Sequence, residues 1–276
     1  MKKFTSMKNL AQKWVWAWAI LFLASCTQTT KNSDGEVQDS TRLGDTVGAI
    51  GVNPLPHAQE FPGASLEVVS LTAELQGSDS ARMTINYQID HFNLTDQTAH
   101  DHDMANSAEG QHIHFILNQE PYVALYAPRH TFTVALDREY SLLSFLSRSF
   151  HESIKTDDAY EWLKFKVNRQ GKVEQLDLPE GPALFYSRPQ KEYSGEDTRA
   201  VLLDFYLVNT TLSANNHQVK AVINDQEFML QQWTPYEILN LPHGESTIRL
   251  TLMDENEEAL EGDFVSTDRT IQLVTF

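Results

Sequence analysis

The stretch Met83–Asp90, MTINYQID, alternates apolar and polar residues at every position. Successive side chains of a β-strand point to opposite faces of its sheet, so this pattern predicts a strand with one buried face. The same alternation recurs in four further segments, at 113–117, 201–207, 219–223 and 248–252. No amphipathic helix of comparable strength accompanies them. Many short strands joined by turn-rich segments predict an all-β, antiparallel sandwich of the immunoglobulin type.

An internal repeat divides these strands into two sets. Leu117–Tyr122, LNQEPY, resembles Ile223–Phe228, INDQEF, at an offset of 106, and the strand at Ser141 resembles the strand at Ser246 at an offset of 105. Upstream, Tyr87 matches Phe205 at an offset of 118, so the first copy carries 118 minus 106, or 12, additional residues. We therefore expect two tandem immunoglobulin-like β-sandwich domains, at 64–170 and 180–276.

The N-terminus has the order of parts of a secretory signal. Lys2, Lys3, Lys8 and Lys13 precede the apolar run Trp14–Ala24, which is too short to span a bilayer as a helix. An ordinary signal peptide, or a core helix that happens to contain a cysteine, is the alternative interpretation. Cys26 is the only cysteine in 276 residues, which favours a specific role for its thiol at this position.

Leu23–Cys26, LASC, resembles the lipobox of bacterial lipoproteins, in which the cysteine is diacylated and becomes the first residue of the mature protein. The resemblance implies a signal peptide at 1–25 and acyl chains, such as palmitate, on Cys26. Membrane binding is then expected through this lipid. Thr27, rather than Asp, follows the cysteine, which by analogy with enterobacterial sorting favours the outer membrane, on its periplasmic or cell-surface side.

The segment that follows Cys26, to about Gly63, is rich in Ser, Thr, Asp, Gly and Pro and has no apolar periodicity. We expect residues 26–63 to form a flexible tether.

The chain without its predicted signal peptide is strongly acidic. Removing the first 25 residues leaves 17 basic and 38 acidic side chains, a formal charge of 17 minus 38, or −21. Such a surface repels nucleic acid and anionic lipid headgroups, so nucleic acid is not an expected partner.

The additional residues of the first copy fall between Leu94 and His112 and are rich in histidine. Because residues two apart on a strand share a face, His112 and His114 should project together, away from the core-facing Ile113. In immunoglobulin lettering the insertion is the B–C loop, and His151 lies in the F–G loop at the same end of the sandwich. The expected metal ligands are thus His100, His102, His112, His114 and His151, with Asp101 or Asp103 as an oxygen ligand or supporting partner.

Imidazole and carboxylate ligands suit Zn²⁺ or Cu²⁺, so we expect one of these ions at the loop end of the first domain. The alternative is a solvated, tag-like histidine cluster without a fixed geometry.

Arg148 and Arg188 lie beside hydroxyl residues and could bind an anionic group. The alternative is that each arginine pairs with a carboxylate of the chain.

Three segments of the chain, at 110–122, 147–155 and 186–204, resemble a family of uncharacterised lipoproteins from Bacteroidetes-type bacteria. Members are sometimes described as phosphopeptide-binding, but no specific phosphate-binding residue can be carried over. The resemblance implies export, a β-rich body and no established reaction.

No enzyme signature stands out. We find no Gly-x-Ser-x-Gly elbow, no phosphate-binding glycine loop and no His-Glu-x-x-His motif. The sequence therefore favours a non-enzymatic binding lipoprotein for an unknown protein, glycan or small-molecule ligand, with a divalent metal as the leading candidate. An adhesion or envelope-assembly module that binds a protein or glycan is the first rival, and a metal-dependent hydrolase is the second.

Overall fold

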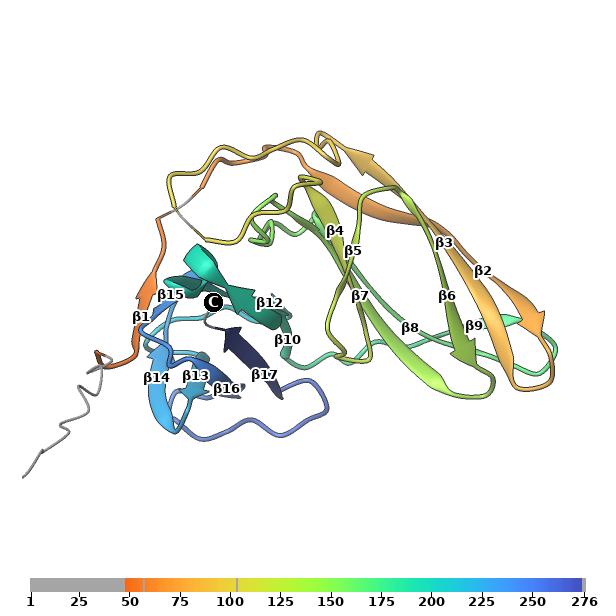
Figure 1. Cartoon of the computed structure of the whole chain (residues 1–276). Coiled ribbons are helices and arrows are strands. Elements are labelled where there is room, and N and C mark those ends of the chain that lie inside the picture. Colours follow the sequence, from red (N-terminus) through yellow and green to blue (C-terminus); the bar gives the residue numbers. More distant parts are fainter. Residues whose placement is uncertain (1–47, 57, 103, 275–276) are drawn as a thin grey trace, which may run out of the picture. The chain divides into compact units, whose positions relative to one another are not determined.

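Two antiparallel sheets built from residues 65–176 pack face to face and form what we call the first sandwich (Figure 1). A computed structural model describes residues 48–56, 58–102 and 104–274 of the chain. One sheet has the order β2(Ser65–Gln76), β3(Ser80–Asp90), β6(Arg129–Ala135). The other has the order β5(Val123–Leu125), β4(His112–Leu117), β7(Glu139–Ser147), β8(Tyr160–Val167), β9(Val173–Leu176).

The second sandwich repeats this arrangement. One of its sheets has the order β1(Gly51–Pro54), β15(Tyr236–Leu239), β12(Ala200–Val208), β10(Ala183–Arg188). The other has the order β11(Lys191–Ser194), β17(Ser266–Val274), β16(Gly244–Met253), β13(Gln218–Ile223), β14(Gln226–Leu230), with β11 parallel to β17. A 3₁₀ helix, η1(Gly195–Thr198), joins β11 to β12, and no described helix is long and apolar enough to cross a membrane.

Both sandwiches have the immunoglobulin-like strand order. If β2 to β8 are lettered A, B, C, C′, E, F and G, the first sandwich has the sheets A-B-E and C′-C-F-G, the latter extended by β9. The strands β10, β12 and β15 form the matching A-B-E sheet, and β14, β13, β16 and β17 form the matching C′-C-F-G sheet. The expected fold, two tandem immunoglobulin-like sandwiches, is confirmed.

The repeated sequence motif makes the same turn in both copies. Asn118 and Asn224 each follow strand C with a positive φ, 52° and 45°, which asparagine tolerates better than most residues. The backbone N–H of Ser141 donates to Asn118 Oδ1 at 2.9 Å, and that of Thr247 donates to Asn224 Oδ1 at 2.9 Å. The asparagine therefore fastens the C–C′ turn to strand F in each sandwich.

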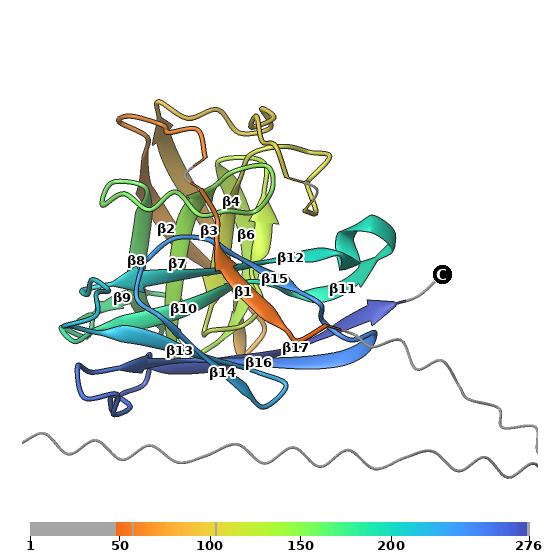
Figure 2. The ribbon, with the colours of Figure 1, turned by 90° about the vertical axis from the view of Figure 1, so that its left-hand side faces the viewer.

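A third hydrophobic core joins the two sandwiches. The C′-C-F-G sheet of the first faces the A-B-E sheet of the second, and the buried side chains between them belong to both: Ile116, Tyr122, Leu143, Phe145, Trp162, Ala183, Phe185, Tyr206 and Val208. We call this region the intersheet layer. The Phe145 and Tyr206 rings stack across it, with centroids 4.6 Å apart. The described residues, from 48 to 274, accordingly belong to one compact unit (Figure 2).

The expected tether is wrong for residues 51–54. These residues form β1, which pairs with β15 through Gly51↔Leu239 to Pro54↔Tyr236. The segment is a four-residue edge strand whose side chains are half-buried or exposed, and a strand this short gives no alternating pattern that a sequence can reveal. The predicted signal peptide, Cys26 and most of the tether lie outside the described residues.

Candidate metal centre

His112 and His114 leave β4 on the same face, as their spacing predicts. Ile113 and Phe115, which alternate with them, belong to the core of the first sandwich. The two histidines therefore face the second sandwich and lie in the intersheet layer, where each is 0% exposed. These two side chains are therefore not part of a solvated histidine cluster, which was the alternative interpretation of the sequence.

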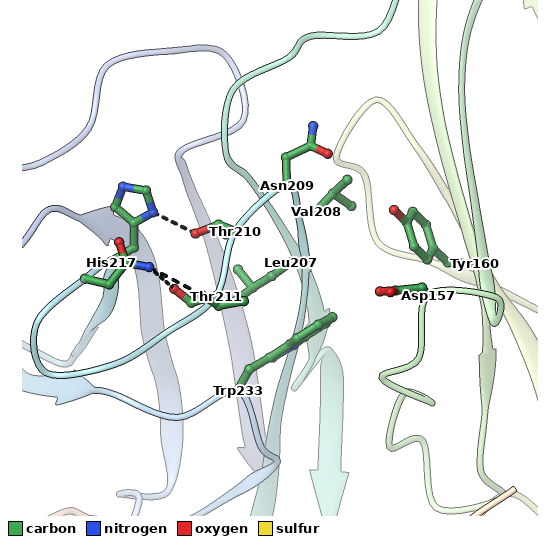
Figure 3. A pocket seen from close by; sticks show the side chains of 10 residues that line it. Asp157, Tyr160, Leu207, Val208, Asn209, Thr210, Thr211, His217 and Trp233 are labelled. Carbon is green, nitrogen blue, oxygen red and sulfur yellow. Dashed lines mark hydrogen bonds between the residues drawn. The ribbon is translucent and has the colours of Figure 1, made fainter. Parts of the chain in front are cut away.

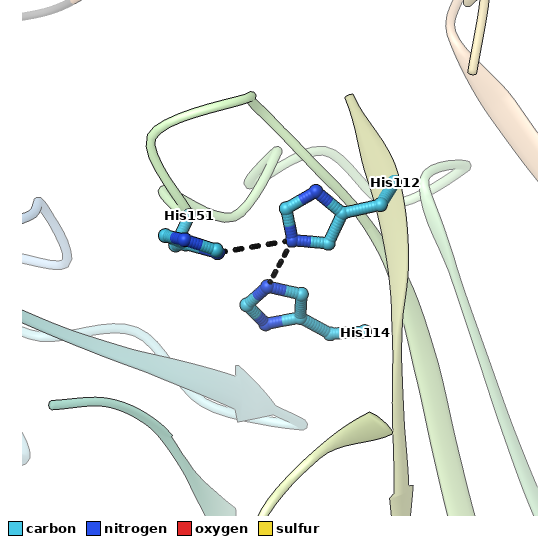
Figure 4. Close-up of side chains that lie close together, drawn as sticks. All are labelled: His112, His114 and His151. Atoms are coloured by element: carbon cyan, nitrogen blue, oxygen red, sulfur yellow. Dashed lines mark hydrogen bonds between the residues drawn. The ribbon is translucent and has the colours of Figure 1, made fainter. Parts of the chain in front are cut away.

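His151 reaches the same point from the loop between β7 and β8, the predicted F–G loop. Its Nδ1 lies 3.1 Å from His112 Nε2, and His114 Nε2 lies 3.0 Å from the same atom. One ligand nitrogen from each of the three rings lies within 4.8 Å of the other two. Figure 4 shows the three rings turned toward one another, and we call this group the histidine triad.

The protons of the triad can be partly assigned. His112 Nδ1 lies 2.8 Å from the carbonyl oxygen of Gly110, which can only accept, so Nδ1 carries the hydrogen of the neutral ring. His112 Nε2 is left with a lone pair, and two further ring nitrogens approach it. A carbonyl that fixes the tautomer of a histidine in this way is typical of metal ligands.

The spacing of the nitrogens fits a metal ion. A tetrahedral Zn²⁺ with Zn–N distances of about 2.0–2.1 Å holds its nitrogen ligands roughly 3.3 Å apart. The two distances to His112 Nε2, 3.0 and 3.1 Å, differ from that value by only a few tenths of an ångström. The remaining pair of nitrogens, on His114 and His151, lies within 4.8 Å, so the three rings would have to rotate to bring all three nitrogens onto one ion.

Burial keeps the triad neutral. It lowers the pKa of His112 from the usual 6.5 to about 4 and that of His151 to about 2, with the nearby Arg188 cation acting in the same direction. Burial lowers the pKa of His114 well below its usual value as well. At neutral pH all three rings therefore have the uncharged form that binds metals.

Two residues that the sequence did not single out complete the surroundings of the triad. The Tyr122 hydroxyl lies 3.0 Å from His151 Nδ1, and the Tyr122 ring stacks on His114 with centroids 3.5 Å apart. Ser187 Oγ, on β10 of the second sandwich, lies 3.1 Å from His114 Nδ1. The nearly unbroken apolar runs of β10 and β12 are the signal that strands there are buried on both faces and meet another sheet.

The structure does not bring the insertion's own histidines into the triad. Among the described residues, only His112, His114 and His151 form a group with metal-ligand spacing. The His100 and His102 rings stack on each other at 4.4 Å, and both contact Phe150. Together with Asp101, they line a separate cavity of about 340 Å³, and Asp103 lies outside the described residues.

The insertion is held in that position by its own hydrogen bonds. Thr98 Oγ1 donates to Gln111 Oε1 at 2.9 Å, and the Thr98 backbone N–H donates to Ser149 Oγ at 3.1 Å. These buried contacts fix the start of the His100 segment against the F–G loop.

The two candidate anion-binding arginines have different surroundings. Arg148 donates to Glu152 at 3.1 Å and to the carbonyl oxygen of Gln59 at 2.6 Å, so the alternative of an internal ion pair holds for it. Arg188 follows Ser187 at the end of β10 and stacks on Tyr122 and Tyr193, with its guanidinium carbon 5.9 and 5.8 Å from the two ring centroids. It thereby borders the triad.

A second open cavity, of about 520 Å³, lies on another part of the molecule (Figure 3). Tyr160 and Trp233 contribute aromatic rings, and Asp157, Asn209 and Thr211 contribute polar groups. The Trp233 indole N–H donates to the carbonyl oxygen of Phe205 at 3.0 Å, which fixes the orientation of the ring.

Comparisons with known proteins add little about function. No protein family model matches the chain, and no curated protein matches it in sequence. Among solved structures, the fibronectin(III)-like modules of Clostridium thermocellum CbhA match with 9% identity and a TM-score of 0.26, over 76% of this chain and 94% of theirs. The two tandem V-type regions of VCBP3, a v-region-containing chitin-binding protein, match with 7% identity and a TM-score of 0.23, over 76% and 98%.

Proposed function

We propose that this chain is an envelope lipoprotein whose β-sandwich body binds a divalent metal ion, Zn²⁺ or Cu²⁺, through His112, His114 and His151. The observation that carries the proposal is the convergence of three neutral ring nitrogens within 4.8 Å in a buried layer. Imidazole suits both ions. The Tyr122 hydroxyl, 3.0 Å from His151 Nδ1, is a further oxygen beside the three rings.

A binding or structural role is favoured over hydrolysis. A catalytic zinc keeps one coordination position open to substrate. The two triad members on β4 have no exposed surface, and the intersheet layer covers them. Of the three rings only His151 is partly exposed, so a macromolecular substrate would have little access to an ion there.

Metal analysis of the purified full chain tests this proposal. After equilibration with Zn²⁺ or Cu²⁺ and removal of free metal, about one ion per chain is expected. ¹⁵N NMR of the zinc form should place the His114 proton on Nδ1, facing Ser187, because Nε2 would be occupied by the metal. Metal content at background level, with the proton on Nε2, would contradict the proposal.

The anchor forms the other half of the proposed function. The LASC motif and the lone cysteine support acylation at Cys26 and attachment to the outer membrane, facing the periplasm or the cell exterior. Replacing the thiol removes the acceptor of the lipid, so Cys26→Ser should leave an unprocessed or soluble protein. Fatty-acid labelling and detergent partitioning measure this outcome. A Cys26→Ser chain that is still labelled and still partitions into detergent would refute the anchor.

A glycan- or protein-binding module is the second candidate. The cavity beside Tyr160 and Trp233 favours it, because aromatic faces next to amide, hydroxyl and carboxylate groups suit a polar organic ligand. The same metal analysis separates the two candidates, since this alternative requires no ion.

A further inference from the structure

Arg188 is a largely buried cation for which the described part of the chain supplies no anionic partner. Only 8% of its surface is exposed. Within the described part of the chain, no carboxylate forms an ion pair with it, and no hydrogen bond leaves its guanidinium. The Tyr122 and Tyr193 rings offset part of the cost of burial through cation–π contacts. Buried charges are normally paired, so the guanidinium has unused capacity to bind an anion.

Arg188 lies next to residues that contact the triad, so an anion bound by its guanidinium would be close to the three histidines. The Tyr122 ring contacts both groups: its centroid lies 5.9 Å from the Arg188 guanidinium carbon and 3.5 Å from the centroid of the His114 ring. Ser187, the preceding residue, bonds to His114. A register shift between Tyr186 and Arg188 in the pairing of β10 with β12 marks a bulge at this point. Bulges re-aim side chains beside functional sites.

Other charges near the triad do not compensate this cation. Lys155 pairs with Asp204 at 2.5 Å, and Glu152 pairs with Arg148 at 3.1 Å. A divalent ion on three neutral imidazoles would add two positive charges to that of Arg188. Such a concentration of positive charge in a buried layer favours uptake of an anion.

We propose that Arg188 forms an oxyanion-binding position beside the histidine triad, and that a small oxyanion bound there also contacts the metal. The planar guanidinium matches two oxygens of a carboxylate, sulfate or phosphate group. The contact with the metal rests on the proposed function; the anion position at Arg188 does not. Since coupling between two sites is reciprocal, the anion should tighten metal binding by the factor by which the metal tightens anion binding.

Calorimetric titration of the full chain with acetate and with sulfate tests the proposal, with chloride at equal ionic strength as the reference. The zinc-loaded chain should bind one oxyanion, and Arg188→Gln should weaken that binding at least tenfold. Acetate and sulfate distinguish a planar carboxylate from a tetrahedral anion. Arg199→Gln removes the same charge from an exposed arginine paired with Glu196 and should bind as the unmodified chain does.

The outcomes separate this inference from the metal proposal. Equal anion binding by the unmodified chain and Arg188→Gln, or none by the zinc-loaded chain, would overturn it. If the chain binds no zinc, the metal proposal fails, and titration of the metal-free chain decides: Arg188-dependent binding supports the anion position, and its absence refutes it. Arg188→Lys keeps the charge without the planar fork; it should bind with intermediate strength and serves as the test variant if Arg188→Gln does not fold.

Discussion

Substituting both triad histidines of β4, as His112→Gln/His114→Gln, should weaken Zn²⁺ binding at least a hundredfold, equivalent to about 2.7 kcal/mol or more. The variant leaves His151 as the only imidazole of the triad, and a single imidazole holds zinc poorly. Competition with a chromophoric chelator at neutral pH measures the change. Glutamine is neutral and polar, so the intersheet layer acquires no charge.

The chain offers a matched control for this experiment. His100→Gln/His102→Gln removes the same number of imidazoles, at the same spacing, from a segment that lies outside the triad. It should bind zinc as the unmodified chain does. Equal losses in the two variants would mean that the insertion supplies ligands after all, and no loss in either would remove the triad as the metal site.

Acid should destabilise the metal-free protein before its carboxylates titrate. The folded protein holds the pKa of His112 at about 4, whereas the unfolded chain has the usual value of 6.5. Above pH 6.5 the ring is neutral in both states and this stability is fully present. Below pH 6.5 the unfolded chain binds the proton and the folded protein does not, so the unfolding free energy falls by about 1.4 kcal/mol per pH unit for this one ring.

His114 and His151 act in the same direction, because their pKa values are also lowered by burial. Between pH 6.5 and 5.0, His112 alone accounts for roughly 2 kcal/mol. Urea unfolding across this range should show the loss in the unmodified chain and a shallower slope in His112→Gln/His114→Gln. Identical slopes would show that these rings are accessible to protons in the folded state.

The sequence predicts the sheets well because strands with one buried face leave an alternating pattern. Met83 and Ile85 lie in the core of the first sandwich, as the stretch 83–90 requires. The immunoglobulin topology also predicts correctly that the B–C and F–G loops meet, since the Thr98 backbone N–H of one donates to Ser149 Oγ of the other. His151 Nδ1 accordingly lies 3.1 Å from His112 Nε2, although the two residues are 39 positions apart in the sequence.

The rest depends on contacts that leave no periodic signal. His112 and His114 were expected to share one face of their strand at the loop end of the first domain, but their spacing does not say what covers that face. In the structure a second sheet covers it, and Ser187 lies 73 residues from its partner His114. The packing of the two sandwiches against each other depends on residues from both halves of the chain, so no short segment of the sequence predicts it.

β1 also limits how far the protein can extend from a membrane. If lipid is attached at Cys26, the first strand begins only 51 minus 26, or 25, positions after the anchor. A chain of that length spans at most about 80–90 Å. A tether that ran to Gly63 would have added roughly 40 Å to this radius. The pairing of four residues with β15 therefore sets the outer limit of the volume in which an anchored copy can meet a partner.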